Sequence, residues 1–302
     1  MSDMSETTIF NRIAIIGIGL IGSSISRAIK MNGLVDFVSV TAKSQKSLDT
    51  AVSLGIADSV TLNLDEAVKG ADIVMICSPM STYAGIMESI APNLKTGAIL
   101  TDVGSVKASV IRDLSPKLPA GVHLVPAHPV AGTEHSGPES GFAELFQGRW
   151  CVITPPTGTD QSAVNKIADL WRAVGSNVEF MDPFHHDQVM AMTSHLPHLI
   201  AYTIVGTATD LEKSLMNEVI KYSAGGFRDF TRIAASDPTM WRDVMLNNKE
   251  AILEMLQRFN EDLTALQRAI RWDEYDTLYE FFLKTRSIRR GVIEANQEKM
   301  YE

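Results

Sequence analysis

Short β-branched apolar runs alternate with amphipathic stretches through the first half of the chain. The run from Arg12 reads RIAIIGIGLIGSSISRAIK, so a strand pattern turns through glycines into a helical pattern that ends near Asn32-Gly33. The segments ADIVMICSP and GAILTDVGS are further apolar runs of the length of buried strands. Because helices between such strands form right-handed crossovers, the pattern predicts a parallel sheet covered on both faces.

Other apolar runs extend this α/β pattern. We expect strands at 36–41, around 123–126, around 150–154 and at 177–182, and helices at about 46–54 and 160–174. The strands around 123–126 and 150–154 are expected to continue the same parallel sheet.

After Pro183 the pattern changes to helical periodicity, and no strand pattern follows. The segment AILEMLQRFNEDLTALQRAI places apolar residues three and four positions apart, which predicts a helix with one buried face. Asp237-Pro238 is typical of a helix start. The sequence therefore predicts an α/β domain at residues 10–182 and an all-α domain at residues 183–302. Whether the long helix packs inside its own domain or against a second subunit stays open.

Composition and charge narrow the classes of protein that fit this pattern. A chain of 302 residues with 45% hydrophobic and 21% charged residues is long enough for two folded domains. Its net charge of -9, without a basic stripe, argues against nucleic-acid binding. Two cysteines, no cationic leader and no apolar run of membrane-spanning length predict a cytoplasmic protein without a membrane partner.

A glycine-rich turn carries the first candidate site. Gly17, Gly19 and Gly22 form GIGLIG where the first strand meets the first helix. This spacing is typical of dinucleotide binding, because it permits a tight turn, a close approach of the pyrophosphate and close packing of helix on strand. The alternative is a plain tight turn. The cofactor-binding candidates of the turn are Gly17, Gly19, Leu20, Ile21 and Gly22. Ser78 and Pro79, at the end of the later run ADIVMICSP, are cofactor-binding candidates too.

The end of the second strand indicates which dinucleotide is preferred. An enzyme that prefers NAD places a carboxylate there to hold the ribose 2′-hydroxyl, but this position is Ala42. Lys43, Ser44 and Lys46 follow it, and two cations with a hydroxyl favour a 2′-phosphate, which a carboxylate would repel. We therefore predict NADP as the preferred cofactor and NAD as a usable one. The alternative is a solvated loop in an enzyme that accepts both.

Three further clusters carry groups suited to chemistry. They are DVGSVK at 102–107, HPVAGTE at 128–134, and the pair SHLPH at 194–198 and GGFRDFTRIA at 225–234. With the glycine motif, their order and spacing resemble prephenate and arogenate dehydrogenases from about residue 10 to 295. The resemblance implies a Rossmann-like N-terminal domain, an all-α C-terminal domain for substrate binding and dimerisation, and prephenate or arogenate as the substrate.

Such an enzyme oxidises a ring carbinol while the carboxylate on the opposite ring carbon leaves as carbon dioxide. His128 is the catalytic candidate, because an imidazole can take a hydroxyl proton near neutral pH, and the resemblance implies the same role. The alternative is a structural histidine bonded to a carbonyl. The resemblance implies that Ser105 orients the histidine or the substrate. Ser105 is also a candidate N-cap for the helix that follows it, and the two roles are compatible.

Arg232 is the candidate clamp for a substrate carboxylate. The resemblance implies this role, and a guanidinium fork can bind a carboxylate through two parallel hydrogen bonds. On a continuous helix, Arg228, Asp229 and Arg232 would share one face. An internal ion pair between Asp229 and Arg232 is therefore the alternative, whereas the resemblance implies that Asp229 controls access to the pocket.

The remaining candidates surround the expected substrate pocket. The resemblance places His195 and His198 near the substrate side chain, and Thr133 and Glu134 along the pocket. Trp241 matches a pocket position too, although a core aromatic is the alternative. A metal site is not expected, because two histidines without a third ligand do not make a closed zinc site. His185 and His186 are interpreted as surface residues.

Two other classes of protein stay open. A related two-domain dehydrogenase for 3-hydroxy acids or imines would share the overall architecture, but it would leave HPVAGTE without an explanation. A dinucleotide-sensing regulator without turnover is the second alternative, and the set of His128, Ser105 and Arg232 argues against it. The sequence does not separate arogenate from prephenate, which differ in the side chain beside the ring.

Overall fold

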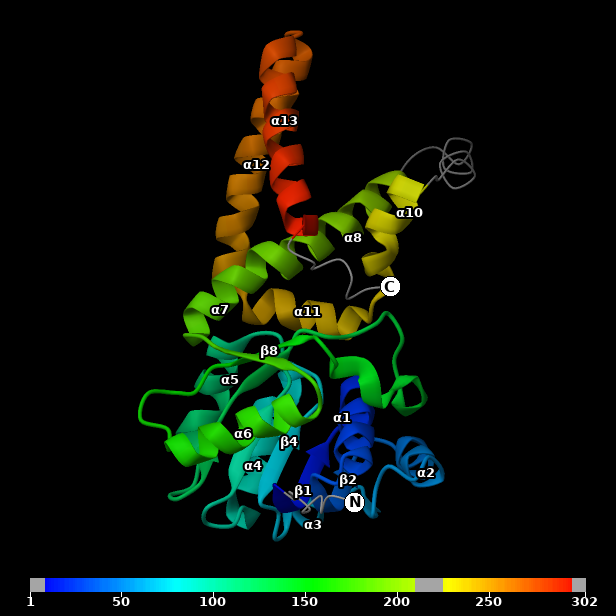
Figure 1. Ribbon diagram of the computed structural model, residues 1–302, viewed down its shortest axis with the longest axis vertical. Coiled ribbons are helices and arrows are strands. Elements are labelled where there is room, and N and C mark those ends of the chain that lie inside the picture. Colours follow the sequence, from blue (N-terminus) through cyan, green and yellow to red (C-terminus); the bar gives the residue numbers. More distant parts are fainter. Residues whose placement is uncertain (1–8, 210–224, 295–302) are drawn as a thin grey trace, which may run out of the picture. The chain divides into compact units, whose positions relative to one another are not determined.

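The structure is a computed structural model that describes residues 9–209 and 225–294. The chain divides into two compact units, Met1–Lys249 and Glu250–Glu302, each of which is described by itself. The first unit contains both sheets and the helices that cover them (Figure 1).

A six-stranded parallel sheet forms the centre of the first unit, in the order β3-β2-β1-β4-β5-β6. The chain order reverses between β1 and β4, and in such sheets ligands bind beyond the carboxyl ends of the strands at this reversal. The strands are β1 Phe10–Ile16, β2 Val35–Thr41, β3 Ser59–Thr61, β4 Ile73–Ile76, β5 Ile99–Asp102 and β6 His123–Leu124.

Helices cover both faces of this sheet, as predicted. Along β1, Ile13 and Ile15 pack into one buried cluster, whereas Ala14 and Ile16 pack into another on the opposite face. This alternation follows from the two-residue period of a strand. The helices are α1 Leu20–Met31, α2 Gln45–Ser53, α3 Leu64–Val68, α4 Tyr83–Ile90, α5 Lys107–Leu114 and α6 Gln161–Ala173. Short 3-10 turns lie at η1 Met80–Thr82, η2 Ala91–Asn93, η3 Ser115–Lys117, η4 Pro138–Ser140 and η5 Ala143–Phe146.

The prediction of one continuous sheet was wrong. The strands β7 Ala127–Pro129, β8 Trp150–Ile153 and β9 Asn177–Phe180 form a separate three-stranded sheet, in which β7 runs antiparallel to β8. Pro126, two residues after the end of β6, has no N–H to give to the first sheet, and its carbonyl instead accepts from the N–H of Thr154 at 3.0 Å. The chain therefore leaves the first sheet at this proline.

The described residues after Pro183 are helical, as predicted, and include no strand. Within the first unit, helix α11, at Pro238–Asn247, packs against η1, which follows β4. The N–H of Ser81 in η1 donates to Asp243 of α11 at 3.0 Å. Asp237 caps α11 as expected, by accepting from the N–H groups of Thr239 and Met240. These elements are α7 Pro183–Met190, the π-helix η6 Ala191–His195, α8 Leu196–Thr209, α10 Gly225–Thr231, the 3-10 helix η7 Arg232–Ala235, and α11 Pro238–Asn247.

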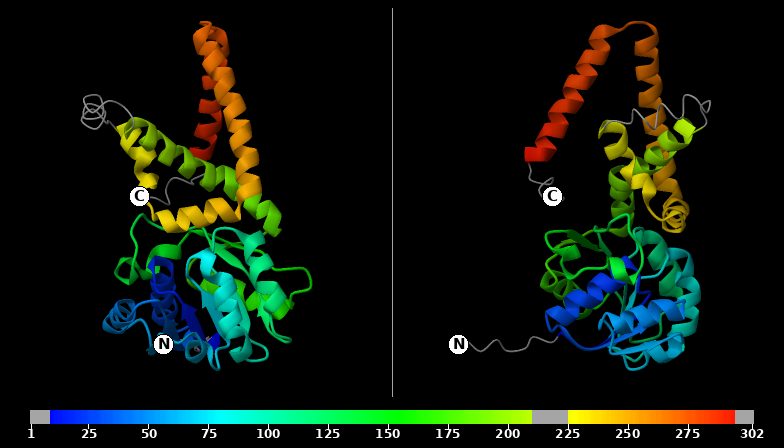
Figure 2. Two further views of the ribbon diagram at one scale, coloured as in Figure 1. Left: turned by 180° about the vertical axis from the view of Figure 1, so that it is seen from behind. Right: turned by 90° about the vertical axis from the view of Figure 1, so that its right-hand side faces the viewer.

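Two long helices make up the second unit. They are α12 Lys249–Arg271 and α13 Tyr275–Glu294, which Figure 2 shows joined by a short turn. Many of their large apolar side chains are exposed, among them Ile270, Tyr275 and Tyr279. Among the described residues, no helix combines the length and apolar character that crossing a membrane would require.

Candidate active site

The glycine turn between β1 and α1 fits a dinucleotide. Gly17 has φ +98°, and a Cβ there would lie 2.8 Å from the backbone of Cys77 and Ser78. A Cβ on Gly22 would lie 2.1 Å from the carbonyl oxygen of Gly17, so both positions require glycine. A Cβ on Gly19 would meet no atom within 4 Å, and no side chain caps α1 at this residue. The backbone is therefore open to a pyrophosphate at a helix start.

The other candidates near this turn have defined places. Leu20 and Ile21 are the first residues of α1 and pack partly against the core. Ser78 follows β4, and its hydroxyl lies 2.8 Å from that of Thr82. Pro79 precedes η1 and is exposed. These residues therefore follow the carboxyl ends of the two strands where the chain order reverses.

The loop after β2 and the first turn of α2 carry the cations predicted to select the dinucleotide. Ala42 follows β2 directly, and Lys43 and Lys46 are exposed. The hydroxyl of Ser44 accepts from the N–H of Ser47 and so caps α2. No acidic residue lies between the end of β2 and the start of α2, so the exposed charges of Lys43 and Lys46 have no carboxylate between them.

His128 lies in β7 opposite Val152 and is 7% exposed. Its Nδ1 atom lies 2.8 Å from Nε2 of His186, which is completely buried. Burial lowers the pKa of His128 well below its usual value, and the charges of His186 and Lys107 lower it further. His128 is therefore a neutral imidazole at neutral pH, which is the form that can accept a proton.

The interpretation of His186 as a surface residue was wrong. His185 is exposed, but His186 is the next residue of α7 and points about 100° away around the helix, toward the core. Its Nδ1 atom lies 2.8 Å from Oδ1 of Asp187, which is buried as well. Sequence reasoning missed this pair, because its only local sign is the triplet HHD at the start of a weakly amphipathic helix.

Asp187 also occupies the place that was suggested for Ser105. Helix α5 begins at Lys107 with Val106 as its N-cap residue, so the N-cap role of Ser105 was wrong. The free N–H groups of Lys107 and Ala108 instead donate to the carboxylate of Asp187, at 2.7 Å and 2.9 Å. Ser105 is half-buried in the loop before α5, and its part in orienting the histidine or the substrate stays a prediction.

A buried ion pair braces this loop against the strand that carries His128. The ammonium of Lys107 donates to both carboxylate oxygens of Asp102, at 2.8 Å and 2.7 Å, and to the carbonyl of Ala127 at 2.8 Å. Both side chains have no exposed surface. Burial lowers the pKa of Lys107, while the carboxylate of Asp102 opposes that shift. Loss of either partner would leave a buried, unpaired charge.

His195 and His198 lie on opposite sides of the junction between η6 and α8. His195 is completely buried, and burial lowers its pKa to about 4. Its Nδ1 atom lies 3.1 Å from Nδ2 of Asn248. His198 stacks on Trp241 with ring centres 3.6 Å apart, and its Nδ1 atom lies 2.8 Å from the carbonyl of Ser194. Trp241 is 8% exposed and belongs to a core cluster, which agrees with the core interpretation.

Arg232 meets Glu134 rather than Asp229. Its Nη1 atom donates to Oε2 of Glu134 at 3.2 Å, and its side chain is 59% exposed. The alternative pair with Asp229 is therefore wrong. Helix α10 ends at Thr231 and Arg232 opens the 3-10 helix η7, so one continuous helix does not carry both residues.

The charge of Arg232 also affects His198. Burial lowers the pKa of His198, and the charge of Arg232 lowers it further, so the two groups are within electrostatic reach. Asp229 is exposed in α10. Thr133 is exposed in the loop after β7, where its hydroxyl accepts from the N–H of His135.

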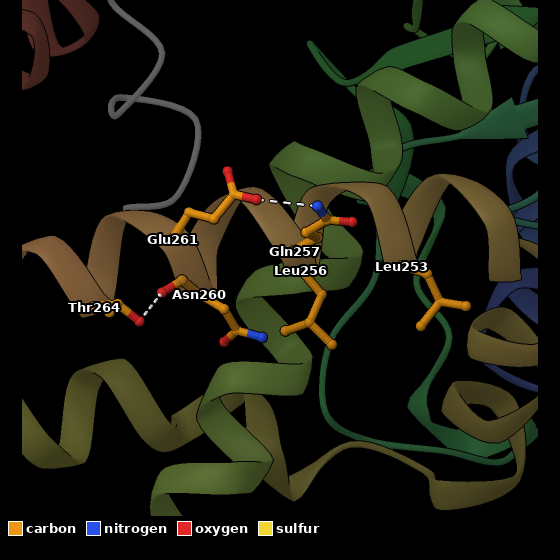
Figure 3. Close-up of a pocket in the computed structure, with 6 residues that line it drawn as sticks. All are labelled: Leu253, Leu256, Gln257, Asn260, Glu261 and Thr264. Carbon is orange, nitrogen blue, oxygen red and sulfur yellow. Dashed lines mark hydrogen bonds between the residues drawn. The ribbon is translucent and has the colours of Figure 1, made fainter.

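Two other features bear on the location of the site. Among residues 9–209 and 225–294, no group of three or more potential ligands is arranged to hold a metal ion. Figure 3 shows a groove in the second unit that contains none of the candidate residues. It is lined by Leu253, Leu256, Gln257, Asn260, Glu261 and Thr264, all from α12. The candidate chemistry therefore lies in the first unit.

Comparison with known families decides the affiliation. The model of the prephenate dehydrogenase nucleotide-binding domain matches residues 25–180, and that of the prephenate dehydrogenase dimerization domain matches residues 182–284. The chain belongs to the prephenate dehydrogenase family. It is therefore an oxidoreductase with a Rossmann-type nucleotide-binding domain and a helical C-terminal region.

Individual relatives of this family are similar over almost the whole chain. The cyclohexadienyl dehydrogenase of Zymomonas mobilis is 44% identical, over 94% of this chain and 97% of that protein. The prephenate dehydrogenase of Bacillus subtilis is 31% identical, over 97% of this chain and 77% of that protein. The prephenate dehydrogenase of A. aeolicus, solved in complex with hydroxyphenyl propionate and NAD+, superposes with a TM-score of 0.86 at 34% identity, over 94% of this chain and 98% of that one.

Proposed function

We propose that this prephenate dehydrogenase family member oxidises and decarboxylates prephenate, arogenate or both, with hydride transfer to a nicotinamide dinucleotide, preferably NADP. The observation that carries the proposal is the buried His128, which contacts His186 and is preceded in the chain by a glycine turn that fits a pyrophosphate. The products are 4-hydroxyphenylpyruvate from prephenate and tyrosine from arogenate.

The chemistry assigned to His128 is reversible proton transfer. His128 accepts the proton of the ring hydroxyl as the carbinol hydrogen leaves as hydride, and the C–O bond becomes a carbonyl. When bound, the nicotinamide supplies the hydride acceptor. The ring carboxylate then departs as carbon dioxide, and its bonding electrons make the ring aromatic. His128 returns the proton to the resulting phenolate, so the imidazole is unchanged after each turnover.

Arg232 is assigned to a substrate carboxylate. Its guanidinium already binds a carboxylate, that of Glu134, and a substrate carboxylate would take that place with the geometry that a planar fork favours. Glu134, Asp229 and Thr133 are proposed to line the entrance. His195 and His198 are proposed to contact the side chain beside the ring, and Ser105 to orient His128 or the substrate hydroxyl.

The preference for NADP rests on the loop after β2. Lys43, Ser44 and Lys46 can neutralise and bind a 2′-phosphate, and Ala42 leaves no carboxylate to repel it. We expect kcat/KM to be larger with NADP than with NAD. Ala42→Asp should reverse that order, because the new carboxylate would bind the 2′-hydroxyl and repel a phosphate. A wild-type enzyme with the larger kcat/KM for NAD would overturn this preference.

A homodimer formed through the helical region is also proposed. Support comes from the match to a dimerization-domain model and from apolar side chains exposed on α12 and α13. Light scattering on the purified protein should give twice the chain mass, and a monomer at assay concentrations would contradict the proposal. The cytoplasmic location predicted from the sequence stays a prediction.

A direct assay tests the proposed reaction. The protein is mixed with NADP and either prephenate or arogenate, and the absorbance of reduced cofactor is followed. Turnover with either substrate supports the proposal, and the ratio of kcat/KM values gives the preference between them. A dinucleotide-sensing regulator would bind NADP without producing the signal, and a 3-hydroxy-acid dehydrogenase would respond only to hydroxy acids.

A further inference from the structure

Asp187 is held in one orientation by two backbone amides and a neighbouring imidazole. Its Oδ1 atom accepts from the N–H of Lys107 and lies 2.8 Å from Nδ1 of His186, while Oδ2 accepts from the N–H of Ala108. Both amides belong to the first turn of α5, where Val106 supplies no side-chain acceptor. Because a helix start favours negative charge, and each carboxylate oxygen already accepts from a backbone N–H, Asp187 acts as a carboxylate that can only accept.

This carboxylate decides where the proton of His186 lies. An ionised carboxylate has no hydrogen to give, so Nδ1 of His186 must carry the hydrogen of the bond to Asp187. Burial lowers the pKa of His186, so its ring is neutral and has a single N–H group. The Nε2 atom of His186 is therefore a bare acceptor.

The bare nitrogen of His186 fixes the tautomer of His128 in turn. The two nitrogens are 2.8 Å apart, and a hydrogen bond between them needs one hydrogen, which Nδ1 of His128 must supply. We infer that His186 and Asp187 are positioning residues that hold His128 in the tautomer whose Nε2 atom is free to accept the substrate proton.

Asn248 sets the opposite tautomer in His195. The backbone carbonyl of Asp187 can only accept, so Asn248 must turn its Nδ2 group toward it, at 2.8 Å. The same Nδ2 group lies 3.1 Å from Nδ1 of His195, which must then accept as well. The hydrogen of the neutral His195 ring therefore lies on Nε2. This atom is buried and has no hydrogen-bond partner among the residues that the structure describes, so it is a donor left over for a ligand.

One hydrogen-bonded group therefore prepares two imidazoles for opposite tasks. Asp187 lies at its centre, with its side chain directed toward His186 and its backbone toward Asn248. His128 presents a bare nitrogen and His195 presents an N–H, so the site offers one acceptor and one donor before any ligand arrives. Such preorganisation lowers the cost of reaching the reactive geometry.

The same contacts can stabilise the proton after His128 has accepted it, a step that rests on the proposed function. When Nε2 of His128 gains the hydroxyl proton, the hydrogen on Nδ1 shifts to Nε2 of His186. The positive charge then lies beside the carboxylate of Asp187, which stabilises it. The reverse shift returns the proton when the phenolate forms, so no hydrogen is gained or lost over a turnover.

Nitrogen NMR on the full-length protein without substrate or cofactor tests the tautomers directly. The chain has seven histidines, and single His→Gln variants assign their signals. We expect His128 to carry its hydrogen on Nδ1 and His195 to carry its hydrogen on Nε2. A His128 ring with its hydrogen on Nε2 would overturn the inference. Because no substrate is present, this result is separate from any failure of the proposed reaction.

A pair of variants tests the role in catalysis. His186→Gln keeps an oxygen acceptor toward Nδ1 of His128, whereas His186→Leu fills space without accepting. We expect His186→Leu to lower kcat by on the order of 100-fold with little change in KM, and His186→Gln to stay within roughly 10-fold of wild type. His185→Gln, at the exposed neighbour, is the matched control and should leave kcat unchanged. Equal kcat values in the Gln and Leu variants would mean that an acceptor at this position has no effect on turnover, which contradicts the inference.

Discussion

The guanidinium of Arg232 and the carboxylate of Glu134 are 98 residues apart in sequence and 3.2 Å apart in space. The pair joins η7 to the loop after β7, so it links the helical segment to the segment that carries His128. Since Arg232 is more than half exposed, this surface pair contributes little to stability, on the order of 1 kcal/mol or less. Such a weak pair could be replaced at small cost by the substrate carboxylate that Arg232 is proposed to bind.

Replacement of Arg232 by glutamine should chiefly raise KM for the substrate. The variant could no longer form the two parallel hydrogen bonds proposed with a substrate carboxylate, but it leaves His128 and its partners in place. We expect KM to rise roughly 10-fold or more, with a smaller change in kcat. Arg232→Lys keeps the charge without the fork and should recover only part of the affinity. Steady-state kinetics distinguish these cases, and an unchanged KM in Arg232→Gln would remove this residue from the binding site.

Replacement of His128 by asparagine should lower kcat strongly and leave the affinity for the cofactor nearly intact. Asparagine keeps a polar group at β7 but cannot accept a proton at neutral pH. We expect kcat to fall on the order of 100-fold or more. Cofactor affinity is measured by fluorescence titration with NADP or NADPH. We expect this affinity to depend on the glycine turn rather than on β7. Wild-type turnover in this variant would refute the assignment of His128.

The buried histidines should make the fold sensitive to acid. Burial lowers the pKa of His128, His186 and His195 from the ordinary 6.5, in the last case to about 4. Below about pH 6.5 the unfolded chain therefore binds more protons than the folded chain, so the free energy of unfolding falls as pH falls. For His195 this loss continues down to about pH 4.

Urea unfolding measured at several pH values between about 7.5 and 4.5 checks this prediction. His195→Asn should reduce the slope of stability against pH, whereas His185→Gln, at an exposed position, should leave it unchanged. A free energy of unfolding that stays constant or rises as the pH is lowered would show that the rings are not buried in neutral form.

The three glycines of the turn should respond differently to alanine. Gly22→Ala places a methyl group 2.1 Å from the carbonyl oxygen of Gly17, so α1 must move away from β1 and both stability and cofactor affinity should fall. Gly19→Ala meets no protein atom and should fold normally. It should still weaken NADP binding, because the methyl group occupies the approach of the pyrophosphate. Equal melting temperatures for Gly22→Ala and wild type would contradict the packing argument, and tight cofactor binding by Gly19→Ala would contradict the location of the pyrophosphate.

The sequence predicted well those elements whose signals are local. The strand, turn and helix at β1 and α1, the helix α6 and the capped start of α11 each depend on periodicity or capping within a few residues. The second sheet was not predicted, since β7 has three residues and its antiparallel partner β8 lies about twenty residues further along the chain. Nothing in so short a strand indicates which sheet it joins.

The site residues that could be predicted from the sequence were likewise those with local signals. The glycine turn is a local motif, and its backbone geometry is what the motif requires. The partner of Arg232 and the burial of His186 depend on contacts between segments 98 and 58 residues apart. No periodicity in one segment reports such a contact, which is why His186 was interpreted as a surface residue and Asp187 was not considered.

Asp187 has a consequence for how such a chain can be divided. It lies on α7, at the start of the segment that matches the dimerization-domain model, yet its carboxylate closes the first turn of α5 in the segment that matches the nucleotide-binding model. The seam between the two matched segments is therefore a poor place for a modular exchange. In a chimera that took its second half from another relative, His128, the proposed proton acceptor, would contact a His-Asp pair from a different protein. The two halves are therefore best inherited, or engineered, as one part.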